Sequence, residues 1–378
     1  MSSKVFAWGL CLIGLTGLTG IAGAQGVRLS GTLSQSFDLN NNQNLSGGGT
    51  TLDSRTGFGL TLSSQTPTSR ISASTGAALR FNSNGNASLS RPQLSLRFGH
   101  DTKPVKYSGG LSFSRREASV DVTQPDLSIL SYSGDETRIN ANLGASTQLN
   151  ARTSFSVRAN GSFVDYDPVS AGLFPTTDLK LTGNLSYQLS PTTTLGLVSS
   201  VGYFNADNAS DTTSVSFDLS GRATYQLDQI TSINGGLGLA FIETTDTVLG
   251  VQSSSFAVSV LFNGGVSRQL PDGSVGLSIS QGIAPSSSGS LVLDTKMTGS
   301  YSKTVNQLVS VGVDATVGRQ ENVGGGRVRT FVGISPRYSR QLTRDITANA
   351  NYYFQRDNTG ATSNGISVSI GRKFDFPL

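Results

Sequence analysis

One stretch in the middle of the chain, Ser214–Phe241, alternates apolar and polar residues along two limbs. The apolar residues of the first limb occupy odd positions, namely Val215, Phe217, Leu219, Ala223, Tyr225 and Leu227. Those of the second limb are Ile233, Leu237, Leu239 and Phe241. Because successive side chains of a strand point to opposite faces, each limb is predicted to be a strand with one apolar face. The polar pair Asp228-Gln229 between them predicts a hairpin.

The length of these limbs indicates where such a hairpin lies. Each alternates for twelve residues or more. Strands of soluble proteins are usually about 5–6 residues long, whereas roughly 9–11 tilted residues cross a bilayer. A long hairpin in a soluble sandwich is the alternative, and repetition of the pattern along the chain counts against it.

The same template recurs at intervals of about 35–45 residues, which indicates a repeated hairpin. A limb ends in Gln-Leu, a short polar turn follows, and a second limb begins. The copies include Gln148-Leu149-Asn150, Gln188-Leu189-Ser190, Gln226-Leu227-Asp228, Gln269-Leu270-Pro271 and Gln341-Leu342-Thr343.

The connections between these hairpins are longer and rich in Gly, Asn, Ser and Asp. They are Asn40–Asp53, Ala118–Glu136, Tyr166–Thr176, Asn205–Asp211, Thr245–Gln252, Ala284–Ser290 and Glu321–Gly326. Short turns at one end and longer loops at the other are typical of outer-membrane barrels, in which the turns are periplasmic. Asn40–Asp53 and Ala118–Glu136 are long enough to fold inward and narrow a pore.

The limbs predict an all-β fold, a transmembrane antiparallel up-and-down β-barrel of about eighteen strands. The predicted ranges are 26–39, 55–65, 70–82, 87–98, 105–117, 137–149, 152–165, 177–189, 192–205, 212–227, 230–244, 253–269, 274–283, 291–304, 307–320, 328–342, 345–357 and 363–376. An even number places both termini in the periplasm. Because Pro92 and Pro104 interrupt the pattern over residues 83–104, sixteen strands is the alternative.

Residues 1–24 are predicted to be a cleaved signal peptide, which leaves residues 25–378 as a single barrel domain. Lys4 provides a positive start, Val5–Ile21 an apolar segment and Ala22-Gly23-Ala24 a small-residue cleavage site. The one cysteine, Cys11, lies in this segment, so the mature chain is expected to hold no disulfide.

Composition agrees with a barrel. Hydrophobic residues make up 36% of the chain and charged residues 14%, and there are 45 glycines. A barrel wall needs apolar residues only at alternate positions, so this polarity fits. Disorder would also suit low hydrophobicity but predicts no sustained alternation. The net charge of +4 is too small and too dispersed to indicate a nucleic-acid partner.

The C-terminus carries the most specific local signal. Apolar residues alternate to its end, namely Ile366, Val368, Ile370, Phe374 and Phe376. This resembles the closing strand of Gram-negative outer-membrane proteins, in which a terminal aromatic residue is recognised by the barrel-assembly machinery. Pro377-Leu378 beyond it, and Arg372 on an apolar position, depart from that pattern.

With its Tyr-x-Leu-Ser/Asp turn segments, such as Tyr187–Ser190 and Tyr225–Asp228, the chain resembles porin-like outer-membrane β-barrels and is similar to the β-barrel porin families of proteobacteria. The general likeness covers residues 25–378. The resemblance implies a location in the bacterial outer membrane, contact with its lipid and lipopolysaccharide, and passive passage of solutes. Whether the barrel is a monomer or a homo-oligomer stays open.

The positions opposite the apolar rows are predicted to face the lumen. Eleven cations stand there, namely Arg28, Arg80, Arg97, Arg116, Arg138, Arg158, Lys180, Arg222, Lys296, Arg329 and Arg337, against four anions, Asp38, Asp218, Asp294 and Asp314. All except Arg116 and Asp38 form the predicted pore lining. Such a surplus attracts anions, because low-dielectric walls focus the field into the water column. Pairing of these charges across neighbouring strands is the alternative.

Catalysis and cofactor binding find little support. The sole histidine, His100, is predicted to lie in a periplasmic turn, so no hydroxyl nucleophile with a histidine base is expected. One histidine and no mature cysteine argue against a transition-metal site. Phe204, Phe331 and Tyr353 are the obvious aromatics on lumen positions, too few for a sugar-stacking path.

The predicted barrel is compatible with two functions. The first is a channel that passes small hydrophilic solutes with a mild preference for anions, without enzymatic activity or cofactor. The second is a surface-exposed barrel that serves adhesion or docks a secretion or polysaccharide-export assembly. Short loops weigh against adhesion, because display uses long ones.

Overall fold

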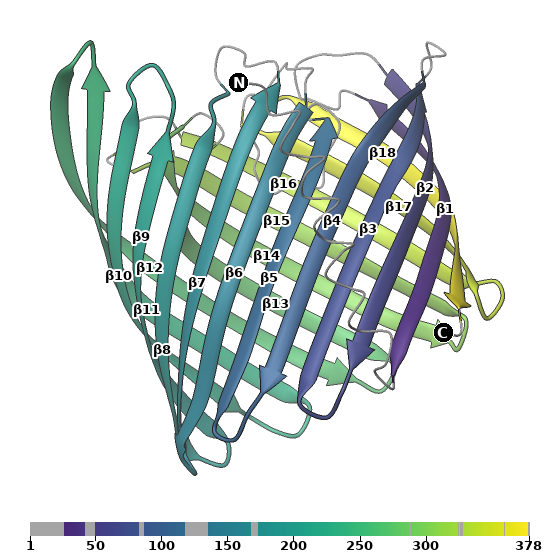
Figure 1. Ribbon diagram of the computed structural model, residues 1–378, viewed down its shortest axis with the longest axis horizontal. Helices are drawn as coiled ribbons and strands as arrows, with labels where there is room; N and C mark the ends of the chain where they lie inside the picture. Colours follow the sequence, from purple (N-terminus) through teal and green to yellow (C-terminus); the bar gives the residue numbers. More distant parts are fainter. Residues whose placement is uncertain are drawn as a thin grey trace.

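The computed structural model describes residues 26–41, 50–82, 87–117, 135–167, 173–286, 289–323, 325, 328–358 and 360–376. These residues form one antiparallel sheet of eighteen strands, which closes into a barrel (Figure 1). Closure occurs because β1 (Val27–Asn41) pairs with both β2 (Thr50–Gln65) and β18 (Thr362–Phe376). The predicted eighteen-stranded barrel is confirmed, and the sixteen-stranded alternative is not observed.

The remaining strands follow in chain order, and each pairs with its neighbours in sequence. They are β3 (Ser69–Asn82), β4 (Ala87–Asp101), β5 (Val105–Glu117), β6 (Asp135–Asn150), β7 (Thr153–Asp167), β8 (Thr176–Ser190), β9 (Thr193–Ala206), β10 (Thr212–Gln226), β11 (Thr231–Val248), β12 (Val251–Leu270), β13 (Gly273–Pro285), β14 (Leu291–Asn306), β15 (Val309–Asn322), β16 (Val328–Gln341) and β17 (Ile346–Asp357).

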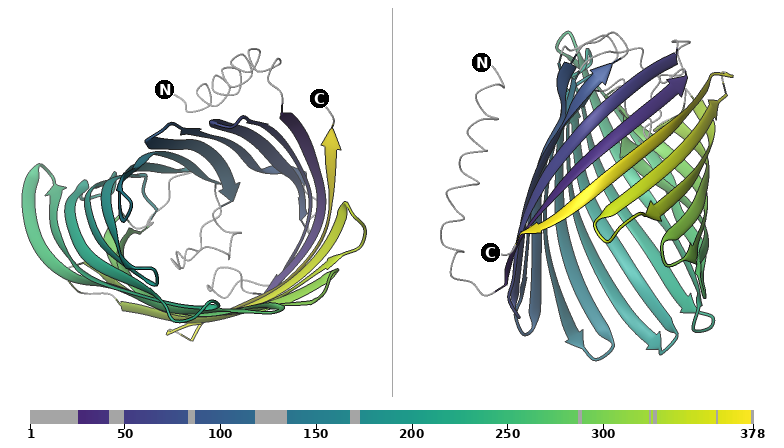
Figure 2. Two further views of the ribbon diagram at one scale, coloured as in Figure 1. Left: turned by 90° about the horizontal axis from the view of Figure 1, so that it is seen from below. Right: turned by 90° about the vertical axis from the view of Figure 1, so that its right-hand side faces the viewer.

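Short and long connections are sorted to opposite ends of the barrel, as the sequence predicts. The short turns, such as 191–192 and 271–272, lie at what we call the turn end, together with Val27 and Phe376. The longer connections, such as 207–211, lie at the opposite end, called the loop end. Figure 2 shows the strands arranged in a ring.

In two copies of the Gln-Leu template, the residue after Leu has an acceptor side chain that closes the turn. Asn150 Oδ1 accepts the N–H of Arg152 and of Thr153, both at 2.9 Å. Asp228 Oδ1 in the β10–β11 turn accepts the N–H of Ile230 at 2.8 Å. This backbone N–H lowers the pKa of the Asp228 carboxyl below its ordinary value.

Large apolar side chains cover the outer surface at alternate positions of each strand. On β10 and β11, Phe217 and Phe241 stack with ring centroids 6.4 Å apart. On β18, Ile366, Val368 and Ile370 are 46–49% exposed. Such a continuous apolar surface fits lipid contact. Arg372, the exception on the apolar row, lies with its guanidinium 4.9 Å from the Phe374 ring centroid.

The region of Pro92 forms a strand, but an irregular one. The β3–β4 register shifts between Gly76 and Ala78, opposite Arg91 and Pro92. Pairing of β4 with β5 begins only at Gln93. Proline has no N–H to donate to a ladder, so the pairing with β5 stops beside it.

The main apolar cluster of the described residues lies inside the barrel towards the loop end. Phe204, Ala206, Ala240, Ile242 and Leu291 form this upper inner cluster and are at most 9% exposed. The inner faces of β9 and β11 supply the first four, and Leu291 follows the β13–β14 connection. Asn208 Nδ2 donates to Gly289 O at 3.1 Å, which fixes this connection against the loop after β9.

Parts of the sequence prediction lie outside the described residues. These are the signal peptide, residues 1–24, and most of the connections Asn40–Asp53 and Ala118–Glu136. In the part of the chain that the structure describes, no helix is long and apolar enough to cross a membrane.

A substitution at Gly318, which faces Phe331, tests the packing of the inner wall. The two residues are register partners, and Phe331 is 6% exposed. A Cβ added at Gly318 would lie 2.0 Å from the Phe331 ring. Gly318→Ala should therefore lower the free energy of unfolding by about 1–3 kcal/mol, the usual cost of overpacking.

Urea unfolding of the refolded barrel measures this effect. Gly221→Ala is the matched control, because an added Cβ there meets nothing within 4 Å. An equal effect of the two substitutions would contradict the role of the Phe331 contact.

Candidate pore lining

Arginines on the inner wall nearer the turn end lie opposite glycines of the adjacent strand. The register pairs are Arg97 with Gly110, Arg158 with Gly144, and Arg222 with Gly196. The closest approach is at Gly196, where an added Cβ would lie 2.6 Å from Arg222 Nε. Glycine therefore leaves room for the arginine side chain to extend across the neighbouring strand.

Nearer the loop end, charged side chains of β1–β3 form a buried network. Arg80 donates from Nε and Nη2 to the two carboxylate oxygens of Asp53, both at 2.9 Å. Arg55 contacts Asp53 at 3.3 Å and also binds Asp38. The side chains of Arg55 and Asp53 are only 7% and 4% exposed. Two guanidinium groups thus share two carboxylates, which compensates the charge.

Similar pairs continue around the wall. Glu136 accepts from Arg116 at 2.8 Å and from Arg138 at 3.0 Å. Lys180 on β8 reaches across β9 to Asp218 on β10 at 2.8 Å. Ser200 of β9 also donates to this Asp218 oxygen, at 2.7 Å.

Two further pairs lie on β15–β17. Arg329 lies 3.5 Å from Asp357 nearer the loop end, whereas Arg337 binds Asp314 nearer the turn end. The inner wall nearer the loop end is therefore largely a set of compensated ion pairs.

Alternation on the confirmed strands places all thirteen predicted pore-lining residues on inward positions. Seven of them take part in ion pairs, namely Arg80, Arg138, Lys180, Asp218, Asp314, Arg329 and Arg337. Among the described residues, the other six have no ion pair in the structure, namely Arg28, Arg97, Arg158, Arg222, Asp294 and Lys296. Arg222 instead donates to Asn184 Oδ1 at 2.6 Å.

Sequence reasoning missed several carboxylates and one arginine of this lining. They are Asp53, Arg55, Glu136, Asp178 and Asp357. β2 and β6 begin earlier than predicted, so Asp53 and Glu136 were assigned to loops. Asp178 and Asp357 lay within predicted strands, where alternation alone would have found them. The cationic surplus of the lumen is therefore smaller than the predicted eleven against four.

His100 lies near the turn end, and its Nδ1 is 2.8 Å from the Ser69 hydroxyl. The His100 side chain is exposed and occupies an outward position of β4, so it lies on a strand and not in the predicted turn, and Ser69 lies opposite it on β3. Among the described residues, no three His, Cys, Asp or Glu side chains come together as a metal site would require.

Neither a family model nor a curated protein sequence matches the chain. Solved structures do resemble the barrel. OpdO of Pseudomonas aeruginosa aligns with a TM-score of 0.52 at 11% identity, covering 94% of this chain and 98% of that chain. OpdL of the same organism gives 0.53 at 10%, covering 93% and 99%. OccAB3 of Acinetobacter baumannii gives 0.51 at 10%, covering 93% and 99%. This likeness shows a shared fold.

The Asp53 network provides a test of the inner wall. Asp53→Asn removes the negative charge between Arg55 and Arg80. The free energy of unfolding should therefore fall by about 3 kcal/mol, as when a buried ion pair loses one partner. The shift of the urea midpoint measures this change.

Asp375→Asn serves as the control. The side chains of Asp375 and its partner Lys373 are 62% and 57% exposed, so Asp375→Asn should lower the free energy of unfolding by less than about 1 kcal/mol. Equal shifts for the two substitutions would show that the buried network adds nothing specific.

Proposed function

We propose that the protein is an outer-membrane channel through which small hydrophilic solutes pass by diffusion, with a mild preference for anions. The observation that carries this proposal is the inner wall: small polar side chains and arginines without an acid partner line the inside of an eighteen-stranded barrel. A barrel of about this size leaves an aqueous interior unless bulky side chains or a plug fill it.

Small polar residues supply most of the inner wall between the charged groups. They include Ser216, Ser220, Thr224, Ser232, Asn234, Ser278, Ser310, Thr347, Asn349 and Asn351. Such side chains bind water and leave space for it. The solved structures that share this fold are outer-membrane porins, which supports the same location and use for this chain.

Anion preference is proposed from the uneven placement of charge along the wall. Nearer the loop end, the cations are largely compensated by carboxylates. Nearer the turn end, Arg97, Arg158 and Arg222 have no acid partner among the described residues. An anion inside the lumen therefore meets a net positive field at that level, in a setting where low-dielectric walls strengthen it.

The alternative of surface display is less favoured by the described connections. The loops at 207–211, 249–250 and 358–361 are short, and display uses long ones. The two longest connections lie largely outside the described residues.

Partners are proposed from the exposed surfaces. The outer apolar rows would contact outer-membrane lipid and lipopolysaccharide. The alternating end of β18, from Ile366 to Phe376, would be recognised by the barrel-assembly machinery during insertion. Whether the barrel stays a monomer or forms a homo-oligomer is a separate question for cross-linking.

Single-channel recording in a planar bilayer tests the proposal. The refolded protein should give steady conductance steps, and its reversal potential in a salt gradient should show that anions carry more of the current than cations. Arg158→Glu with Arg222→Glu should shift the reversal potential towards cations, because both side chains lie in the lumen.

The control is Arg152→Glu with Arg344→Glu, which changes the net charge equally but in short turns. Its effect should be smaller, since salt screens exposed charges over about 10 Å at 0.1 M. A folded barrel that gives no conductance steps would refute the channel while leaving the fold intact.

A further inference from the structure

The hydrogen-bonded ladder between β12 and β13 stops part-way up the wall. Pairing runs from Leu270 with Gly273 to Phe262 with Gln281. Beyond that point, Val251–Leu261 of β12 pairs only with β11, and Gly282–Pro285 of β13 pairs only with β14. We call these two facing segments the β12–β13 seam. In Figure 1, the β11–β12 hairpin projects beyond its neighbours at the loop end.

The seam reaches down into the apolar outer surface. Val258 and Val260 lie on it, and they are register partners of Phe241 and Leu239, which belong to the apolar rows. Both valines are about half exposed, at 53% and 48%. Unpaired backbone groups at this level are costly in hydrocarbon, so the wall is weakened where the seam enters it.

A single side chain replaces the missing ladder at the base of the seam. Gln281 Nε2 donates to the carbonyl oxygen of Val260 at 2.7 Å. Gln281 Oε1 accepts from the Thr295 hydroxyl at 2.8 Å. A rotation of this one side chain breaks the bond between β13 and β12, whereas a ladder must open residue by residue.

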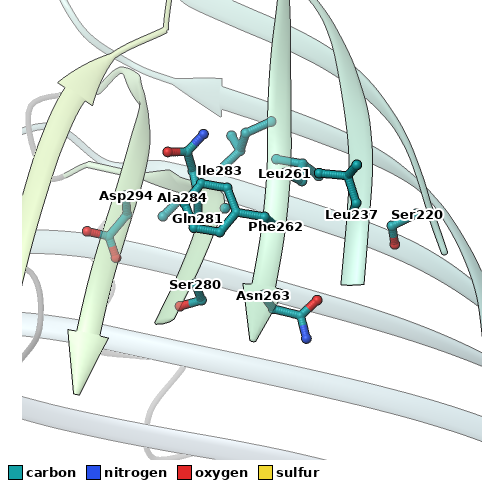
Figure 3. Close-up of a pocket in the computed structure, with 11 residues that line it drawn as sticks. Ser220, Leu237, Leu261, Phe262, Asn263, Ser280, Gln281, Ile283, Ala284 and Asp294 are labelled. Carbon is teal, nitrogen blue, oxygen red and sulfur yellow. The ribbon is translucent and has the colours of Figure 1, made fainter. Parts of the chain in front are cut away.

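A pocket of about 360 Å³ lies at the same place (Figure 3). Its apolar lining comes from Leu237, Leu261, Phe262 and Ile283, and its polar lining includes Asn263, Ser280 and Asp294. The pocket is lined by both inward and outward positions of the wall, so it reaches into the wall's thickness.

The polar and apolar parts of this pocket are separate. Leu261 and Ile283 also pack against the upper inner cluster, which extends the apolar surface towards the lumen. On the polar side, Asp294 Oδ1 is buried and has no hydrogen-bond partner among the described residues. An unpartnered buried acceptor is costly, so a ligand that donates a hydrogen bond is favoured there.

We propose that this pocket binds a single-chain amphiphile and that the β12–β13 seam lets it pass between the lumen and the surrounding lipid. The alkyl chain lies against Leu261, Phe262 and Ile283, and a hydroxylated head donates to Asp294. The volume is at the lower end for ligand pockets, which fits one chain rather than two. This route goes beyond the proposed channel and does not depend on whether the lumen conducts ions.

Tryptophan fluorescence tests the route. In a Trp8→Phe background, Ser220→Trp places the only tryptophan on an inward position that lines the pocket. Thr224→Trp is the matched control, on the same face of β10 but outside the pocket lining. In vesicles, a monoacylglycerol brominated along its chain should quench Ser220→Trp several-fold more strongly than Thr224→Trp. Equal quenching of both would overturn the proposal.

Covalent closure of the seam gives the second measurement. Continuing the register places Leu261 opposite Gly282, and an added Cβ at Gly282 meets nothing within 4 Å. Leu261→Cys with Gly282→Cys, made with Cys11→Ser, should abolish the extra quenching when oxidised and restore it on reduction. Quenching that persists in the oxidised form would overturn the proposal.

Two further variants give independent results. Gln281→Ala removes the bond to Val260, so quenching of Ser220→Trp should reach half-saturation at lower amphiphile concentration; no change would count against the seam as the entrance. Disulfide-linked dimers of the single Val258→Cys variant, whose position faces outward on the seam and is 53% exposed, would mean that a second copy covers the seam, which also overturns the proposal. Conductance of hydrophilic ions, recorded on the same proteins, separates these outcomes from failure of the channel.

Discussion

The pairing of every backbone N–H and C=O inside a bilayer is the constraint on which the rest of this structure depends. Strands satisfy it only if the sheet has no free edge, and the β1–β18 ladder removes that edge. The wall is then one strand thick between two different environments, so each strand must alternate. Where the ladder stops beside β12, the Gln281 side chain takes over one backbone acceptor. The same constraint thus explains both the regular wall and the side-chain bond at this interruption.

The closed wall also decides how its charges meet. Side chains that face one lumen from neighbouring strands are brought together by register, so Asp53 binds Arg80 across a hairpin. Nearer the turn end, glycines opposite Arg97, Arg158 and Arg222 leave room for the guanidinium groups without supplying a carboxylate. The lumen is therefore largely compensated at one level and cationic at another, which a count of charges along the sequence does not reveal.

The loop end combines two features that act on one part of the wall. The β13–β14 connection is fixed to the loop after β9 through Asn208 and Gly289, and Leu291 packs against Phe204 and Ile242. At the same end, the upper part of β12 is paired on one side only. Apolar side chains thus line the inside of the barrel where its wall is least continuous. A uniformly polar conduit needs neither feature.

The sequence by itself determined the secondary structure and its order. Alternation with a period of two marks every strand, and the Gln-Leu turns fix which end carries short connections, because both signals are local. The sequence correctly predicted an irregularity at Pro92. The residue shifts the β3–β4 register and interrupts the pairing of β4 with β5, but the strand itself forms. Only the tertiary structure decided which charges pair, as Lys180 and Asp218 do across β9, and where the β12–β13 ladder ends. Those properties depend on register and on packing between residues far apart in the chain, which local alternation does not specify.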